Sequence, residues 1–278
     1  MSGLSEEVAL TQAAPAATPR QRSHLKAVAV PTEHGGWGLT LEPALLGMLV
    51  QPGTAGLALA FVPIVGFLTR QPLKIALVDM YRGRNLERTR VARRVAAVEL
   101  AVFVALVAVA VVTAKGSFWI PAAISAVLVS VELGFDVRSR SRRLVPELAG
   151  AMGVNGVAAM IVLANGGDAR VAAASWLVLN ARALTSIPFV REQVTRLHGR
   201  PTRPGLTIAT DAVAIAVAGS AVAVLPGALA GAVTIAAVVA YQRISAIKPP
   251  RRAAMIGAAQ IVVGLTVVLV TALGILAP

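Results

Sequence analysis

The sequence predicts an all-α polytopic membrane protein, a bundle of about nine transmembrane helices. Hydrophobic residues make up 56% of the 278 residues and charged residues only 14%, whereas a soluble domain carries about 25% charged residues. The hydrophobic residues fall in long runs, and the basic residues lie mostly between these runs. Because a helix crosses a bilayer with about 20 mainly apolar residues, each run is a candidate span.

The candidate spans occupy most of the chain after its first 30 residues. We expect residues 1–30, in which residues 13–22 are rich in Ala, Pro and Thr, to form a disordered cytoplasmic tail. Residues 31–278 would form one transmembrane domain. The Pro52-Gly53 turn predicts a tight hairpin between the first two spans, and Pro226-Gly227 predicts another. The nine predicted spans are 37–51, 54–69, 93–113, 117–136, 145–165, 171–190, 206–225, 227–246 and 254–276.

The basic residues predict the orientation. Of the 26 lysines and arginines, 23 lie in the N-terminal tail and in every second connection between spans. The positive-inside rule then places the N-terminus inside and the C-terminus outside. We expect a multi-pass protein of the plasma membrane. The net charge of +13 is therefore assigned to topology and to contacts with anionic lipids, not to nucleic acid. Polar residues gather at the inner helix ends, so any site should open to the cytoplasm.

The stretch from Pro31 to Leu39 differs from the rest of the chain. It places Glu33, His34 and three glycines at the mouth of the first span. An acid beside a histidine at the membrane surface can act as a catalytic acid or base, or can orient a ligand. The alternative is an interfacial turn in which Trp37 serves as an anchor.

The connection after the second span could bind an anion. Arg70 and Lys74 are four residues apart and would share a helix face. Two cations on one face suit a phosphate or a carboxylate. Asp79 follows and could pair with Arg82. The alternative is an amphipathic interfacial helix that begins near Pro72.

The sixth span contains Arg182, about two turns before its apolar run ends, and Arg191 follows at the inner surface. An arginine at this depth is by default a candidate for function. The alternative is that its side chain snorkels to the interface.

Carboxylates near or inside the spans need partners. Glu132 and Asp136 are four residues apart and could hold a divalent cation or share a proton. A simpler interpretation pairs Asp136 with Arg140. No cysteine is present and no metal or cofactor motif is found, so no metal site is predicted and the cofactor is unknown. Three further carboxylates had no evident partner: Glu42, Glu99 and Asp211.

The residues from Glu33 to Gly38, followed by Pro43, Gly47 and Arg70-Gln71-Pro72, resemble the YwiC-like family of bacterial integral membrane proteins. This resemblance extends over about residues 30–278. The architecture also looks like that of the UbiA-type prenyltransferase superfamily, which implies transfer of a prenyl group from a diphosphate held through magnesium by two aspartate-rich loops. This chain departs from that pattern: Asp79 is the only aspartate of the first loop, and the second loop has no aspartate, only Glu192.

Two functional hypotheses follow, and a structural membrane protein without a ligand is a third. In the first, a UbiA-like bundle binds or modifies an isoprenoid-like lipid with an anionic head at the cytoplasmic face, with Glu33 and His34 as catalytic groups. An enzyme of this kind would be a transferase without the magnesium motifs. In the second, the protein transports or exports a small anion. In the first hypothesis the head group contacts Arg70, Lys74, Asp79, Arg182 and Arg191.

Overall fold

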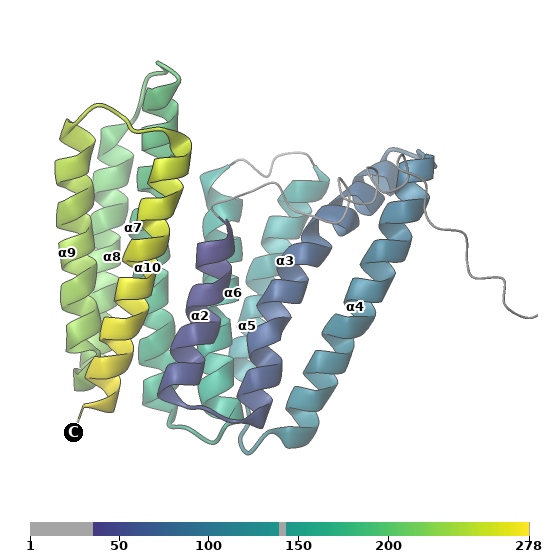
Figure 1. Ribbon diagram of the computed structural model, residues 1–278, viewed down its shortest axis with the longest axis horizontal. Helices are drawn as coiled ribbons and strands as arrows, with labels where there is room; N and C mark the ends of the chain where they lie inside the picture. The colour runs from purple at the N-terminus through teal and green to yellow at the C-terminus, as the bar shows by residue number, and fades with distance from the viewer. Residues whose placement is uncertain (1–35, 139–142, 278) are drawn as a thin grey trace, which may run out of the picture.

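The computed structural model describes residues 36–138 and 143–277, and within these ranges it contains helices and connections but no strand. Each predicted span coincides with one helix, which confirms the all-α prediction. The predicted tail and the pair Glu33 and His34 lie outside the described ranges. The helices are α2 (Gly36–Val50), α3 (Thr54–Tyr81), α4 (Glu87–Thr113), α5 (Trp119–Val137), α6 (Leu144–Ala164), α7 (Ala169–Leu197), α8 (Pro204–Val224), the 3-10 turn η1 (Pro226–Ala228), α9 (Leu229–Ile247) and α10 (Ala253–Leu276) (Figure 1).

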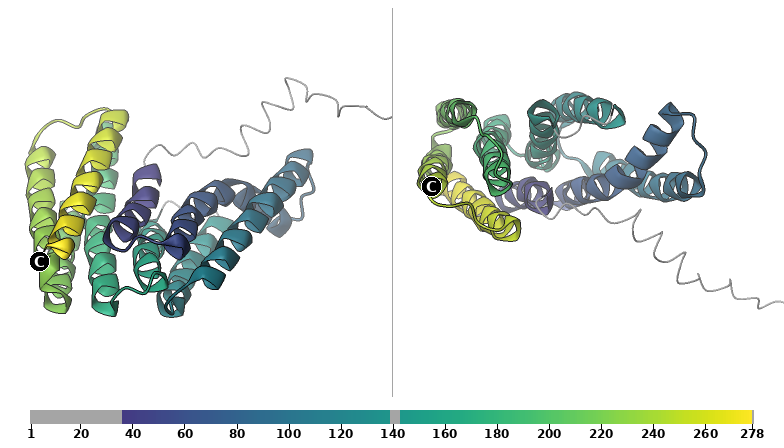
Figure 2. Two further views of the ribbon diagram at one scale, coloured as in Figure 1. Left: turned by 60° about the horizontal axis from the view of Figure 1, so that its bottom comes forward. Right: turned by 90° about the horizontal axis from the view of Figure 1, so that it is seen from above.

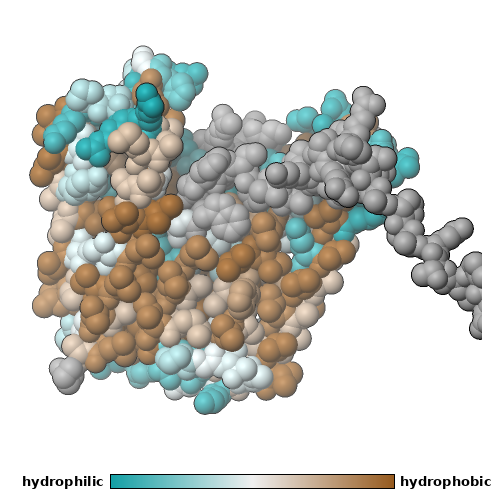
Figure 3. Space-filling view, viewed as in Figure 1, coloured by the Kyte–Doolittle hydropathy of each residue, from teal (hydrophilic) through white to brown (hydrophobic). Residues whose placement is uncertain are grey.

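The helices have the lengths and composition of membrane spans. Seven helices in the described part of the chain are long and apolar enough to cross a bilayer. Of the other two, α2 is apolar but has only 15 residues, and α7 has 29 residues that include Arg182 and Arg191. A broad hydrophobic band covers the middle of the molecule, between two more hydrophilic ends (Figure 3). The chain is therefore a multi-pass integral membrane protein.

Helices α3 and α7 continue beyond the spans predicted for them. The sequence predicts that the second span ends at residue 69 and that a new helix begins near Pro72, but one helix runs through Pro63 and Pro72 to Tyr81. Helix α3 bends along its length, as helices do at proline (Figure 1). Helix α7 likewise runs through Pro188 to Leu197. Proline is tolerated inside such helices because neighbouring groups satisfy the freed backbone.

Helices α2 and α6 occupy the middle of the bundle. Helix α2 contacts α3, α6, α7 and α10, and 67% of the membrane-crossing stretch of α6 is buried. Small residues permit this close packing. A Cβ atom added to Gly47 of α2 would lie 2.8 Å from the Cβ of Ile161 in α6. Helix α4 lies at the edge of the bundle beside α3 (Figure 2).

The connections divide between the two ends of the bundle. At one end the α2–α3 turn is held by Asn165, whose Nδ2 donates to the carbonyl of Gln51 at 2.7 Å and whose Oδ1 accepts from the amide of Gly56 at 3.0 Å. These bonds fix the hairpin predicted at Pro52-Gly53. The other end, called the basic end here, contains the connections α3–α4, α5–α6, α7–α8 and α9–α10 (Figure 1). The positive-inside rule predicts that the basic end faces the cytoplasm.

Candidate functional site

Arg70 and Lys74 of α3 pair with two carboxylates of α5. Arg70 lies 2.8 Å from Glu132 Oε1 through Nη2 and 3.1 Å from Asp136 Oδ2 through Nε, and Lys74 Nζ lies 3.5 Å from Asp136 Oδ1. We call these four residues the α3–α5 charge cluster. The side chain of Asp136 is only 1% exposed. Glu132 and Asp136 thus face cations of another helix, and Arg140, the partner considered for Asp136, lies outside the described residues.

Asp79 and Arg191 occupy two other ion pairs. Asp79 accepts hydrogen bonds from Thr89 Oγ1 at 2.6 Å and from Arg88 Nη2 at 3.2 Å, so it fastens the end of α3 to the start of α4. Arg191 of α7 lies 2.7 Å from Glu147 of α6. The predicted ligand-binding residues therefore do not form one site. They belong to four separate groups of contacts: the α3–α5 charge cluster, the contacts of Asp79, the pair of Arg191 with Glu147, and the contacts of Arg182.

Arg182 forms a buried pair with Glu42 in the interior of the bundle. Arg182 is 2% exposed and Glu42 is 3% exposed. The Nη2 atom of Arg182 lies 3.4 Å from Glu42 Oε1 and donates to the backbone carbonyl of Gln260 at 2.8 Å. This pair joins α7 to α2 and α10, and it supplies the partner that Glu42 lacked in the sequence. The Nε and Nη1 atoms of Arg182 have no hydrogen-bond partner among the described residues.

The carboxylate of Glu42 fits against α10 only because residue 264 is glycine. A Cβ atom added to Gly264 would lie 1.8 Å from Glu42 Oε1. Gly264 is four residues after Gln260, so one turn of α10 accommodates the acid and accepts the hydrogen bond from Arg182. This turn of α10 therefore contacts both members of the buried ion pair, Glu42 at Gly264 and Arg182 at Gln260.

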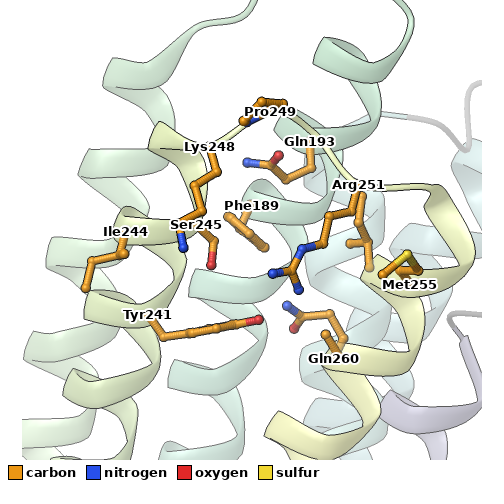
Figure 4. A pocket seen from close by; sticks show the side chains of 12 residues that line it. Phe189, Gln193, Tyr241, Ile244, Ser245, Lys248, Pro249, Arg251, Met255 and Gln260 are labelled. Carbon is orange, nitrogen blue, oxygen red and sulfur yellow. The ribbon is translucent and has the colours of Figure 1, made fainter.

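Gln260 also lines a cavity at the basic end, between α7, α9 and α10 (Figure 4). The cavity has a volume of about 180 Å³ and is partly open to the surroundings. Its wall combines aromatic, apolar, amide and cationic side chains from all three helices and from the α9–α10 connection. Its principal residues are Phe189, Gln193, Tyr241, Lys248, Arg251 and Gln260.

The α9–α10 connection that borders the cavity is held by α7. Arg196 donates to the carbonyl of Ala246 at 2.5 Å and to that of Lys248 at 3.1 Å. Pro249 and Pro250 restrict the backbone that follows. A basic side chain thus satisfies carbonyls at the end of α9 that have no partner within the helix. The result is a short, fixed connection that places Lys248 and Arg251 at the rim of the cavity.

The rim of the cavity is cationic and its amide groups are incompletely bonded. Neither Lys248 nor Arg251 forms an ion pair with a carboxylate of the residues that the structure describes. Gln193 is 3% exposed, and its Nε2 atom has no acceptor within the described ranges. The Oε1 atom of Gln260 is buried without a donor there. Buried polar groups are normally satisfied, so this cavity has the properties of a binding site for a polar ligand.

One side of the cavity is suited to an apolar group. Ile244 of α9 is 58% exposed and Met255 of α10 is 53% exposed, and both line the cavity near its opening. Exposed apolar side chains at this position are suited to contact with the apolar part of a ligand. In Figure 4 the guanidinium of Arg251 extends inward over the cavity, while Ile244 and Met255 lie at its sides.

Deeper in the same helices, a polar network joins α7, α8 and α9. Thr185 donates to Asp211 at 2.6 Å and contacts Gln242 Oε1 at 2.8 Å, and Gln242 donates to Ser186 at 3.1 Å. Arg243 lies 2.6 Å from Asp211. This network supplies the partners of Asp211 and connects α7 with α9, two of the helices that form the cavity.

Sequence reasoning did not identify the cavity residues. In the sequence, Lys248 and Arg251 do not differ from other basic residues that indicate topology, and no pattern assigns a role to the cavity glutamines. The detectable signal was a glutamine within a hydrophobic segment, as at Gln260. No group of three or more His, Asp or Glu side chains suited to a metal ion occurs in the described part of the chain.

Comparison with known protein families gives a match over part of the chain. The family model described as YwiC-like protein matches residues 30–163, from before α2 to the end of α6. No curated protein and no solved structure matches the chain, so the similarity to UbiA-type enzymes stays a prediction. The matched residues include the segment from Glu33 to Gly38 and Arg70-Gln71-Pro72, on which the resemblance was based. Over residues 30–163, this chain is similar to the family of YwiC-like proteins.

Proposed function

We propose that this membrane protein binds an amphiphile with an anionic head group in the cavity between α7, α9 and α10. The observation that carries the proposal is the position of Lys248 and Arg251 at the rim of a partly apolar cavity, without a carboxylate partner among the described residues. A phosphate or carboxylate would accept charge-assisted hydrogen bonds from both cations. The apolar chain of the ligand would leave past Ile244 and Met255 into the bilayer.

The location of the cavity supports a ligand that comes from the membrane. The cavity lies at the basic end, where a lipid head group would meet the rim while its chain remained in the hydrophobic band. A juxtamembrane lysine or arginine gains about 1 kcal/mol near an anionic membrane surface. Under the positive-inside rule this is the cytoplasmic face of the plasma membrane.

Arg182 acts in this proposal as a positioning residue. Its guanidinium contacts the backbone of Gln260, whose side chain lines the cavity. Replacement of Arg182 by alanine should therefore reduce ligand binding without removal of a rim cation. Direct contacts of Arg70, Lys74, Asp79 or Arg191 with a ligand remain predictions, as do the catalytic roles of Glu33 and His34 in a transferase.

The test measures binding of dodecyl phosphate to the full chain in maltoside micelles by isothermal titration, with ligand concentration expressed as mole fraction. The Lys248→Gln/Arg251→Gln variant should bind at least 10-fold more weakly than the wild type. The matched control is Arg90→Gln/Arg94→Gln, which removes the same charge from exposed positions on α4. This control should bind within about 2-fold of the wild type, because its cations are remote from the cavity.

Two results would contradict the proposal. Equal weakening in both variants would show that the ligand responds to net charge alone. Inorganic phosphate that bound as tightly as dodecyl phosphate would show that the apolar chain contributes nothing, and it would favour the alternative of a small-anion transporter.

A further inference from the structure

The two glutamines of the cavity place requirements on the ligand in addition to a negative charge. Gln193 Nε2 is a buried donor without an acceptor, and Gln260 Oε1 is a buried acceptor without a donor, among the described residues. Both side chains line the same cavity. A buried donor or acceptor left unsatisfied costs about 1–3 kcal/mol. A ligand that satisfied both groups would be favoured over one that satisfied a single group.

A fully ionised anion can satisfy Gln193 Nε2 but not Gln260 Oε1, among these two unsatisfied atoms. The oxygens of a carboxylate and of a fully ionised phosphate accept hydrogen bonds but do not donate them. They can therefore accept from Gln193 Nε2, Lys248 and Arg251, but they would repel Gln260 Oε1. Gln260 requires an O–H or N–H group. Its backbone is fixed by the hydrogen bond from Arg182, so the side chain stays at the cavity wall.

Nearby protein groups do not remove this requirement. The Tyr241 hydroxyl end is directed toward Gln260 (Figure 4), yet Gln260 Oε1 has no donor within the described ranges. In Figure 4 the Arg251 guanidinium lies between the two glutamines, where it can hold an anionic group while its neighbours contact other parts of the same head. The polar wall thus offers a cation at Arg251, a hydrogen-bond donor at Gln193 and an acceptor at Gln260.

We infer that the ligand is a hydroxylated phosphate, in which a phosphate and at least one hydroxyl group lie on adjacent carbons or nearly so, as in a glycerol phosphate head group. This inference rests on the proposed function. The phosphate accepts from Lys248 and Arg251, and the hydroxyl donates to Gln260 Oε1. The shared chemistry is that of a polyol phosphate, either as a lipid head group or as a free molecule.

The test compares three probes by the same titration: dodecyl phosphate, 1-dodecyl-glycerol 3-phosphate and glycerol 3-phosphate. The wild type should bind the dodecyl-glycerol compound about 10-fold more tightly than dodecyl phosphate, because only the former donates a hydrogen bond to Gln260. The Gln260→Met variant, which keeps a side chain of similar length without the acceptor, should bind these two probes equally. Thermal unfolding without ligand, compared with that of the wild type, shows whether the variant is folded.

Equal affinity of the wild type for the two tailed probes would overturn the inference, and so would a preference retained in Gln260→Met. Both results leave the proposed function intact if binding still depends on Lys248 and Arg251. Glycerol 3-phosphate should bind at least 10-fold more weakly than the tailed compound. If glycerol 3-phosphate bound as tightly as 1-dodecyl-glycerol 3-phosphate, the preference for a hydroxyl group would still stand. The ligand would then not need an apolar chain, and the proposed function would be wrong.

Discussion

The α3–α5 charge cluster and the α7–α9–α10 cavity each contain two basic side chains, but the surroundings of these side chains differ. Arg70 and Lys74 face two carboxylates that balance them. Lys248 and Arg251 face glutamines, aromatic rings and the lipid boundary, with no carboxylate among the described residues. The first arrangement is electrically complete and stabilises helix packing. The second leaves positive charge and hydrogen-bonding capacity for a ligand.

The largest expected loss of stability comes from the buried pair that adjoins the cavity. Arg182→Ala leaves Glu42 in the interior without its cation, and removal of one partner from such a pair costs about 3–5 kcal/mol. Thermal unfolding in micelles, followed by tryptophan fluorescence, would measure this loss. The double variant Glu42→Gln/Arg182→Met should recover most of it, because no unpaired charge remains. A single variant that unfolded like the wild type would contradict the structural role of the pair.

Asp136→Ala tests the other region and should separate stability from binding. This change removes the contacts with Arg70 and Lys74, whose side chains are 27% and 32% exposed. The expected cost is about 1.5–3 kcal/mol, as for hydrogen bonds to charged groups. The affinity for dodecyl phosphate should stay unchanged in titrations at a temperature where the variant is folded. A fall in affinity as large as that of Lys248→Gln/Arg251→Gln would erase the distinction between the two regions.

Gly264→Ala should weaken the link between the buried pair and the cavity. The new methyl group would overlap Glu42, and overpacking of this kind costs about 1–3 kcal/mol. The matched control is Gly257→Ala on the same helix, where an added Cβ atom would meet nothing within 4 Å. That control should be neutral or stabilising by up to about 1 kcal/mol. Equal melting temperatures for the two variants would argue against the close fit at Gly264.

The smallest effect on stability is expected at the cavity rim. Lys248→Gln/Arg251→Gln removes exposed cations that have no ion pair among the described residues, so the free energy of unfolding should change by no more than about 0.5 kcal/mol. The same variant should lose most of its binding. Thermal unfolding without ligand would measure the first quantity. A loss of several kcal/mol there would mean that the rim cations stabilise the fold, like those of the α3–α5 charge cluster.

The architecture could be predicted from the sequence because it depends on local composition. Most apolar runs are long enough to form a span, and Pro52-Gly53 marks a turn without reference to distant residues. The continuation of α3 through Pro72 could not be predicted, because it depends on packing against α4 and α5.

The candidate site depends on contacts between distant parts of the chain, and these could not be predicted. Arg182 was identified by its depth in an apolar span, but its partner Glu42 lies 140 residues away. Lys248 and Arg251 have the same appearance in the sequence as any basic connection. Only the positions of α7, α9 and α10 show that these cations border a cavity with unsatisfied glutamines.

The most direct test of the central claim is native mass spectrometry of the protein purified in mild detergent, with a search for a retained anionic amphiphile. The wild type and the control Arg90→Gln/Arg94→Gln should each carry a bound species of the same mass. Lys248→Gln/Arg251→Gln should carry none, while Asp136→Ala should retain it. A bound amphiphile retained equally by Lys248→Gln/Arg251→Gln would contradict the claim that the cavity between α7, α9 and α10 is the binding site.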